Sequence, residues 1–219
     1  MGGVVVSGPQ NDARRPSRRT WGYWTEQKLS MLAAYLPAFT TASRSSPRTL
    51  YLDLFAGDDR NLSRLTGEVI SGSPRVALDA VPQFSKVVLF ELPAQAARLG
   101  KQLKDSYAGR DLQVVSGDCN QTVGTVLRGL QRTGWDMAPT FALIDQYAAE
   151  VRWPTLEELS RFKRRGRSKV ELWLLFAASM LPRGLASEEA RDATWLPDNT
   201  FLRHEEHSRD GDIQHGLRD

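Results

Sequence analysis

Four acidic residues of this chain stand at, or just after, the ends of short apolar runs. Asp53, Glu91 and Asp145 each close such a run, and Asp118 follows another by three residues. Short apolar runs of this kind indicate buried strands of a parallel sheet. Because ligands of open α/β sheets bind outside the carboxyl ends of the strands, these acids mark a candidate ligand site.

The stretch after Asp53 indicates which ligand the site would take. It contains one glycine, Gly57, and continues with Asp58 and Asp59. A loop that cradles phosphate uses more glycine, so that backbone N–H groups can approach the anion. Two carboxylates would repel a dinucleotide pyrophosphate, whereas a ligand with a cationic centre and ribose hydroxyls suits the site. We therefore expect S-adenosylmethionine, the common ligand of that kind, as the cofactor.

Each acid can be given a part in holding such a ligand. A carboxylate such as Glu91 accepts hydrogen bonds from two vicinal ribose hydroxyls, and Asp118 can accept one from an adenine amine. Asp53 can lie near the methionine ammonium, held directly or through water. Gly57 lets the backbone approach the ligand closely, and Phe55 in the same stretch completes the predicted cofactor-binding set.

Asp145 and Tyr147 are the candidate catalytic residues, because they would face the methyl donor from the substrate side. Tyr147 could stack on a planar acceptor while Asp145 orients its amine. Three of these residues also have a structural interpretation. Asp53 or Asp118 could cap the following helix, and the Tyr147 side chain could be partly buried in packing contacts.

The apolar runs alternate with helical patterns, which predicts an α/β fold with a Rossmann-like, doubly wound, mostly parallel sheet and helices on both faces. No closing strand pair is expected after the fifth strand. Right-handed crossovers place the four acidic strand ends along one edge of the sheet. The strands are expected at 50–53, 86–91, 112–115, 140–145 and 170–176, and the helices from residue 25, at 73–82, 93–107 and 121–132, and from residue 155.

Local signals refine two of these helices. Thr25 is expected to cap the first helix, with a buried stripe of Leu29, Leu32, Ala33, Leu36 and Phe39. Pro37 and the polar stretch 43–47 are expected to end it. Ser73 is expected to cap the next helix, with Pro74 at its first position. The connection 61–70 shows no clear period.

Composition shifts divide the chain into three parts. Residues 1–20, rich in Gly, Pro, Arg and Ser, are expected to form a disordered tail, although Arg14 to Arg19 could touch nucleic acid. Residues 21–185 are expected to form the Rossmann-like domain, and 186–219 a polar, poorly ordered segment.

The whole chain has ordinary globular composition: 219 residues, 41% hydrophobic and 25% charged. A single cysteine, Cys119, excludes a disulfide framework and a multi-cysteine zinc site within the chain, and we expect it to be a buried or half-buried structural thiol. No apolar run approaches the roughly 18 residues of a membrane span, and the first residues do not form a convincing signal peptide. We expect a cytoplasmic protein without membrane contact.

A basic cluster could bind a phosphate backbone, with Phe162 available to stack. The alternative is a basic helix end that complements the helix dipole. Three histidines near the end of the chain, His204, His207 and His215, lack the spacing of a zinc hydrolase, and we expect no metal site. The candidate nucleic-acid-binding residues are Arg161, Lys163, Arg164, Arg165 and Arg167.

The successive motifs resemble those of class I S-adenosylmethionine-dependent methyltransferases. More closely, the chain is similar to the three-Cys-motif partner protein family, over roughly Trp21 to Phe176. The segments that carry this resemblance are Trp24–Leu29 with Tyr35-Leu36, Tyr51–Gly57, Gly72-Ser73-Pro74, Phe90-Glu91, Gly117–Asn120 and Leu143–Tyr147.

The resemblance implies an S-adenosylmethionine site and, as ancestral reaction, methyl transfer to a nucleic-acid amine of DNA or RNA. It implies a three-Cys-motif protein as partner. Asp53, Gly57, Glu91 and Asp118 would hold the cofactor, while Asp145 would face the acceptor together with Tyr147.

Two further hypotheses stay open. Asp59 stands where a second glycine is expected, and Gln146 stands where the family tends to have proline. Together with the missing closing strands of a truncated or divergent member, they favour a binding or partner module that has lost turnover. The third hypothesis is a nucleic-acid-binding accessory protein that works mainly through the basic cluster.

Overall fold

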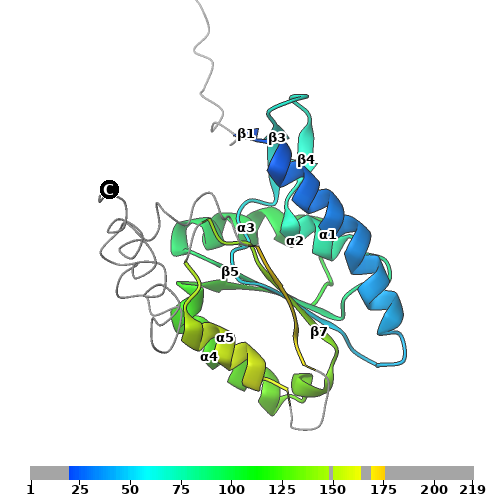
Figure 1. Cartoon of the computed structure of the whole chain (residues 1–219), viewed down its shortest axis with the longest axis vertical. Coiled ribbons are helices and arrows are strands. Elements are labelled where there is room, and N and C mark those ends of the chain that lie inside the picture. Colours follow the sequence, from blue (N-terminus) through cyan, green and yellow to red (C-terminus); the bar gives the residue numbers. More distant parts are fainter. Residues whose placement is uncertain (1–19, 148–149, 164–168, 176–219) are drawn as a thin grey trace, which may run out of the picture.

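Five parallel strands form the central sheet of the protein (Figure 1). The structure, a computed structural model, describes residues 20–147, 150–163 and 169–175. The strand order is β6-β5-β2-β7-β8. The strands are β2 (Leu50–Asp53), β5 (Lys86–Glu91), β6 (Leu112–Ser116), β7 (Thr140–Ile144) and β8 (Glu171–Leu174). The predicted sheet is confirmed.

The chain winds outward from the central strand β2 in two directions. It first builds β5 and β6 on one side, then returns to build β7 and β8 on the other. The order therefore reverses between β2 and β7, and in open α/β sheets the crevice outside the carboxyl ends at such a reversal is where ligands bind.

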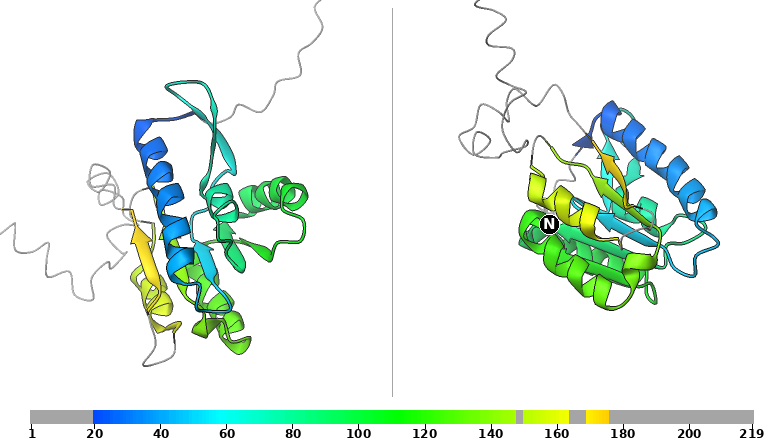
Figure 2. Two further views of the ribbon diagram at one scale, coloured as in Figure 1. Left: turned by 90° about the vertical axis from the view of Figure 1, so that its right-hand side faces the viewer. Right: turned by 60° about the horizontal axis from the view of Figure 1, so that its bottom comes forward.

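Helices cover both faces of the sheet, as predicted (Figures 1 and 2). On one face lie α1 (Tyr23–Ala42), α2 (Ser73–Leu78) and α3 (Pro93–Ser106). On the other lie α4 (Cys119–Arg132), the short 3-10 helix η1 (Trp135–Met137) and α5 (Trp153–Arg161). Proline stands in the first turn of α2, α3 and α5, where its missing N–H costs nothing.

The two faces have separate apolar cores because side chains alternate along each strand. In β2, Leu50 and Leu52 pack with α4 and α5, whereas Tyr51 packs with α1, α2 and α3. All four side chains of β2 are buried. The central strand is therefore apolar throughout except at its last residue, Asp53.

Helix α1 differs from the prediction at its start and near its middle. It begins at Tyr23 with Gly22 as N-cap and no side-chain cap, so the predicted cap at Thr25 is wrong. It also continues through Pro37 to Ala42. The free energy gained by burying the helix against the sheet offsets the cost of the backbone hydrogen bond that proline removes. The buried stripe is Leu29, Leu32, Leu36 and Thr40, while Phe39 is half-buried and Ala33 is exposed.

The connection 61–70 contains a hairpin that its lack of period did not predict. Strands β3 (Arg60–Ser63) and β4 (Val69–Ser71) pair antiparallel, and β1 (Thr20–Trp21) adds to β3 in parallel. Figure 1 shows this small sheet beside the beginning of α1. The Ser63 hydroxyl donates a hydrogen bond to Glu26 of α1 at 2.6 Å. The strands are too short and too unevenly buried to show a clear alternation.

The short helix α2 ends earlier than predicted, at Leu78 rather than near residue 82. The Arg110 guanidinium donates a hydrogen bond to the Leu78 carbonyl at 2.7 Å, which satisfies a carbonyl of the last turn. No helix among the described residues is long and apolar enough to cross a membrane. The segments 1–19 and 176–219, where the tails and any closing strand pair would fall, lie outside the described residues.

Candidate functional site

The register of the sheet brings the strand-end acids to one edge, at two depths. Asp53 of β2 lies level with Leu89 of β5 and Leu143 of β7. Glu91 and Asp145 stand two residues beyond these partners. Asp53 is therefore set one pleat deeper in the sheet than Glu91 and Asp145.

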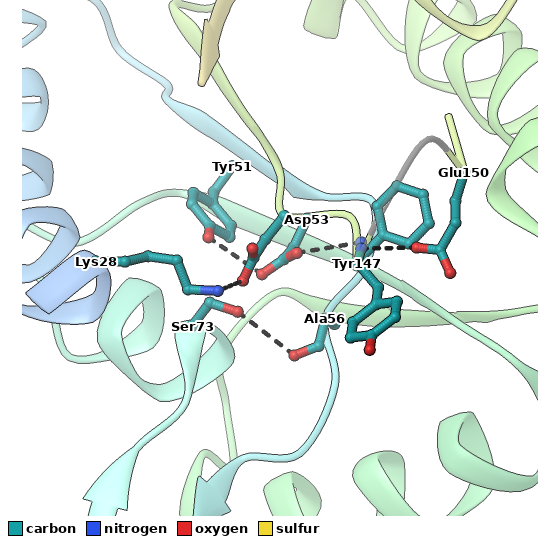
Figure 3. Close-up of polar contacts among 9 residues, drawn as sticks. Lys28, Tyr51, Asp53, Ala56, Ser73, Tyr147 and Glu150 are labelled. Carbon is teal, nitrogen blue, oxygen red and sulfur yellow. Dashed lines mark hydrogen bonds and ion pairs between the residues drawn. The ribbon is translucent and has the colours of Figure 1, made fainter. Parts of the chain in front are cut away.

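Asp53 is completely buried and bonded to its own strand and loop (Figure 3). Its carboxylate accepts hydrogen bonds from the Tyr51 hydroxyl at 3.2 Å and from the Phe55 backbone N–H at 3.3 Å. Burial raises the pKa of Asp53 to about 7, and the negative charge of Asp145 adds to the shift, while hydrogen bonds to the carboxylate lower it. Asp53 therefore holds the loop after β2 in place. The sequence predicted a place near the methionine ammonium of the cofactor, whereas the carboxylate is completely buried and bonded within the protein.

The loop after β2 is held close to its neighbours by backbone contacts. The Ala56 N–H donates to the Phe90 carbonyl at 3.1 Å, and the Ala56 carbonyl accepts from the Ser73 hydroxyl at 3.4 Å. Gly57 has a φ of 65°, a left-handed conformation that favours glycine. Half-buried Phe55 packs against the core on the α4 face. The loop is thus a fixed element at the carboxyl end of the central strand.

The Gly72-Ser73-Pro74 motif supports this loop. A Cβ placed on Gly72 would lie 2.0 Å from the Asp58 carbonyl oxygen, so only glycine fits. Gly72 is also the N-cap of α2, without a side-chain cap. The predicted cap at Ser73 is therefore wrong. The Ser73 hydroxyl donates a hydrogen bond to the Ala56 carbonyl instead.

Both acids that follow Gly57 are paired with arginines. Arg98 of α3 forms an ion pair with Asp58, and Arg75 of α2 forms one with buried Asp59 at 2.7 Å. These pairs neutralise the charge that was expected to repel a phosphate, so the charge of this loop does not exclude a pyrophosphate. The preference for S-adenosylmethionine then rests on the single glycine of the loop and on the acids at the neighbouring strand ends.

Glu91 and Asp118 lie on the β5–β6 side of the edge. Glu91 is half-buried at the end of β5 and accepts a hydrogen bond from the Leu92 N–H at 3.2 Å. Asp118 is the N-cap of α4 and accepts from the Asn120 N–H at 2.9 Å. The helix-cap reading of Asp118 is therefore correct, and its side chain is half-buried beside the same edge.

Asn120 fixes the next loop, a part that the sequence analysis did not assign. Its side-chain oxygen accepts from the Arg152 N–H and from the Thr155 hydroxyl, both at 2.8 Å, and its amide nitrogen donates to the Glu150 carbonyl at 2.9 Å. Asn120 thereby ties the start of α4 to the start of α5. The only sequence feature that pointed to Asn120 is its place in the Gly117–Asn120 motif, next to Asp118 and Cys119.

Asp145 is paired with a residue that sequence reasoning missed. The Lys28 ammonium, from α1, donates to the Asp145 carboxylate. The two side chains are 16% and 23% exposed. Lys28 lies in the Trp24–Leu29 motif, but 117 residues separate it from Asp145, so no local pattern predicts the pair.

Tyr147 and Gln146 follow Asp145 in opposite environments. Tyr147 is 71% exposed, and its backbone N–H donates to the Glu150 carboxylate at 2.8 Å (Figure 3). The Tyr147 ring is therefore not packed in the core. Gln146 is buried, and its side-chain oxygen accepts from the Val151 N–H at 2.9 Å. Its amide nitrogen has no hydrogen-bond partner among the described residues.

The basic cluster divides between the surface, the interior and undescribed residues. Arg161 is exposed and pairs with Glu157 one turn earlier at 3.4 Å. Lys163 is buried, and its ammonium donates to the Ala138 carbonyl. Burial lowers the pKa of Lys163 to about 8, against the charge of Asp136, which raises it. Lys163 thus does not face solvent, contrary to the role expected for it. Arg164, Arg165 and Arg167 lie outside the described residues.

Cys119 is a structural thiol, as predicted. It is buried in the core on the α4 face, and burial, with the charge of Asp118, raises its pKa to about 12. Such a thiol stays protonated and unreactive at neutral pH. The three histidines weighed as metal ligands, His204, His207 and His215, lie outside the described residues.

No protein-family model matches this chain, and a search of curated proteins found no match either. The similarity to the three-Cys-motif partner family therefore stays a prediction from the quoted motifs.

Proposed function

We propose that this protein binds S-adenosylmethionine at the carboxyl edge of its central sheet and transfers a methyl group to a nucleic-acid amine. One observation carries the proposal. Glu91, Asp118 and Asp145 stand at or beyond the carboxyl ends of strands on both sides of β2, the strand beside which the strand order reverses. That is the place where sheets of this kind bind nucleoside ligands.

The residues at the edge fit the polar groups of the cofactor. Glu91 accepts hydrogen bonds from the ribose hydroxyls, and Asp118, while it caps α4, borders the adenine. The fixed loop at Gly57 offers backbone at close range to the methionine part. Asp53 acts beneath this loop as a positioning residue, because its carboxylate holds the Phe55 N–H. When bound, S-adenosylmethionine supplies an electrophilic methyl group on a sulfonium centre.

Asp145 and Tyr147 prepare the acceptor. Exposed Tyr147 stacks on the planar acceptor, and Asp145 accepts a hydrogen bond from its amine. With the cofactor held by Glu91, Asp118 and the loop at Gly57, the methyl group that it supplies would pass to the amine nitrogen that Asp145 orients, with S-adenosylhomocysteine as the second product and the amine proton released to water.

Calorimetric titration with S-adenosylmethionine tests the proposal. We expect saturable binding by the wild type and at least about a tenfold loss of affinity in Glu91→Ala, because hydrogen bonds to a charged group contribute about 1.5–3 kcal/mol each. Glu68→Ala removes an exposed carboxylate from the β3–β4 hairpin and should leave the affinity unchanged. Folded wild-type protein that gives no heat at millimolar ligand would contradict the proposal.

A binding or partner module without turnover is the second candidate, and two contacts favour it. Lys28 already occupies the Asp145 carboxylate, and the Gln146 side chain is bonded to the Val151 N–H. In that case a three-Cys-motif protein is the proposed partner. Binding of S-adenosylmethionine that Glu91→Ala abolishes, with no methyl transfer to any DNA or RNA, would support this candidate over the first.

A further inference from the structure

The small sheet of β1, β3 and β4 grows directly out of the loop that borders the proposed cofactor site. Strand β3 begins at Arg60, shortly after Gly57, and the chain returns from β4 to Gly72. The Gly72 N–H donates to the Asp59 carbonyl at 2.8 Å, which closes the base of the hairpin. Figures 1 and 2 show this small sheet projecting beyond the central sheet beside the beginning of α1. None of the proposed cofactor or acceptor contacts uses the projection.

Hydrogen bonds hold the turn between β3 and β4 in place. The Ser63 hydroxyl accepts from the Leu65 N–H at 3.1 Å and from the Thr66 N–H at 3.0 Å. The Arg64 N–H donates to the Trp21 carbonyl of β1 at 2.8 Å. Side chains of this turn are therefore presented from an ordered backbone, which lowers the entropy cost of binding a partner.

Two exposed arginines of the hairpin make no ion pair with the described residues. Arg60 stands opposite Ser71 across the β3–β4 pair, so no acid faces it from the neighbouring strand. Arg64 lies in the turn that follows β3. By contrast, Arg75 and Arg98, on the helices that flank the same loop, are each paired with an aspartate. The guanidinium groups of Arg60 and Arg64 are thus available to an anionic partner.

An arginine run leads into the same small sheet. Four of the six residues before β1 are arginines, and these lie outside the described residues: Arg14, Arg15, Arg18 and Arg19. The run is covalently joined to Thr20, the first residue of β1, which pairs with Leu62 of β3. Glu68 is the one acid between residues 60 and 71. Sequence continuity therefore adds the positive charge of the run to that of the hairpin.

The beginning of α1 connects the hairpin to the predicted acceptor residues. Glu26 accepts a hydrogen bond from the Ser63 hydroxyl at 2.6 Å, and Lys28, two residues later, pairs with Asp145. Both contacts fall within one turn of the same helix. The hairpin therefore stands beside the side of the proposed site that takes the methyl acceptor.

We propose that the small sheet and the arginine run before it bind the phosphate backbone of a nucleic acid. Guanidinium groups recognise phosphate through paired, charge-assisted hydrogen bonds, and phosphate contacts fix the position of a strand on a protein. The inference rests on the proposed function, because it assigns the surface that holds the nucleic acid whose amine is methylated. The place of the surface beside Asp145 favours a nucleic acid over an acidic protein as the partner.

Fluorescence anisotropy with a labelled single-stranded oligonucleotide, at several salt concentrations, tests the inference. Affinity should fall as salt rises, and each lost phosphate contact should reduce the slope of log affinity against log salt by about 0.7. Arg60→Gln combined with Arg64→Gln should therefore lower the affinity at least about tenfold at about 0.1 M salt. Replacing the four arginines of the run by glutamine should reduce the slope further, and Glu68→Ala should strengthen binding.

The matched control removes the same charge from the opposite edge of the sheet. Arg44 and Arg132 are exposed where α1 and α4 end, and Arg44→Gln combined with Arg132→Gln should change the affinity by less than about twofold, because salt screens distant charges. Equal losses in the two arginine pairs would show that net charge alone drives binding, and would overturn the inference.

Three other results would also overturn it: no binding by folded wild type, an affinity that does not respond to salt, or displacement of the oligonucleotide by polyglutamate as readily as by unlabelled oligonucleotide. The last result would assign the surface to an acidic protein. Because these measurements need no S-adenosylmethionine, they succeed or fail independently of the calorimetric test of the cofactor site.

Discussion

Asp53 shows at the scale of one residue how a strand-end acid can serve structure before chemistry. Its carboxylate is completely buried between Tyr51 and the backbone of Phe55. Burying an ionised carboxyl is costly, which is why its pKa rises to about 7. Asp53 lies one pleat below the edge on which Glu91 and Asp145 stand, where its carboxylate bonds the loop after β2.

The raised pKa of Asp53 predicts a pH dependence of stability with a definite sign. Between the ordinary value of 3.8 and the folded value of about 7, the folded state holds a proton that the unfolded state has released. The contribution of Asp53 to the free energy of unfolding is therefore most favourable below pH 4 and is lost as the pH rises towards 7. Asp53→Asn stays neutral and keeps an acceptor for the Phe55 N–H.

Urea unfolding of wild type and Asp53→Asn across pH 4.5 to 7.5 measures this effect. The stability of Asp53→Asn relative to wild type should increase with pH over that range, by on the order of 1–3 kcal/mol. A difference between the two proteins that does not change with pH would show that Asp53 titrates in the folded state as it does in the unfolded chain.

At the scale of elements, α2 is the support of the loop after β2. It is only six residues long, too short to be stable on its own. Buried Arg75 joins it to Asp59 at 2.7 Å, and its guanidinium lies 5.4 Å from the centre of the Tyr107 ring at the end of α3. The Tyr107 hydroxyl in turn donates to Asp79 at 2.8 Å. This network connects the loop, α2 and α3.

Breaking the buried pair should cost far more than breaking the exposed one beside it. Arg75→Met leaves the Asp59 carboxylate buried without its partner, and we expect a loss of about 3 kcal/mol in the free energy of unfolding. Arg98→Met removes the partner of Asp58, but the Arg98 side chain is 52% exposed, so the expected loss is below about 1 kcal/mol. Chemical denaturation measures both, and equal losses would contradict the proposed role of Arg75.

Gly72 and Gly100 form a second matched pair. Gly72→Ala places a methyl group 2.0 Å from the Asp58 carbonyl oxygen, so the loop or α2 must shift, and we expect a destabilisation of about 2 kcal/mol or more. Gly100 lies in α3 with nothing within 4 Å of an added Cβ, so Gly100→Ala should stabilise by about 0.5–1 kcal/mol. Thermal unfolding gives both values, and a neutral Gly72→Ala would mean that the loop is not held by this contact.

At the scale of the whole molecule, local patterns predicted the sheet and its acidic edge. Each strand of the central sheet follows a short, largely apolar run, and Pro74 and Pro93 stand in first helical turns. These signals need no knowledge of distant residues. The meeting of Asp53, Glu91 and Asp145 at one edge followed from the parallel order of the strands.

What the sequence could not predict depends on pairing across long distances. The depth of Asp53 follows from the register of β2 against β5 and β7, and a strand's own residues do not specify its register. The Lys28–Asp145 pair joins the first helix to the fourth strand of the central sheet, and Arg75 reaches Asp59 from a helix that only the fold brings near. Burial of Lys163 likewise depends on the packing around the Ala138 carbonyl.

The central claim, a cofactor site at the carboxyl edge of the sheet, is tested most directly by a crystal structure of the protein with S-adenosylmethionine. The account predicts that the two ribose hydroxyls lie within hydrogen-bonding distance of the Glu91 carboxylate, that the loop at Gly57 borders the methionine part, and that Asp53 stays buried beneath it. Ligand bound at another face of the protein, or with its ribose away from Glu91, would contradict the account.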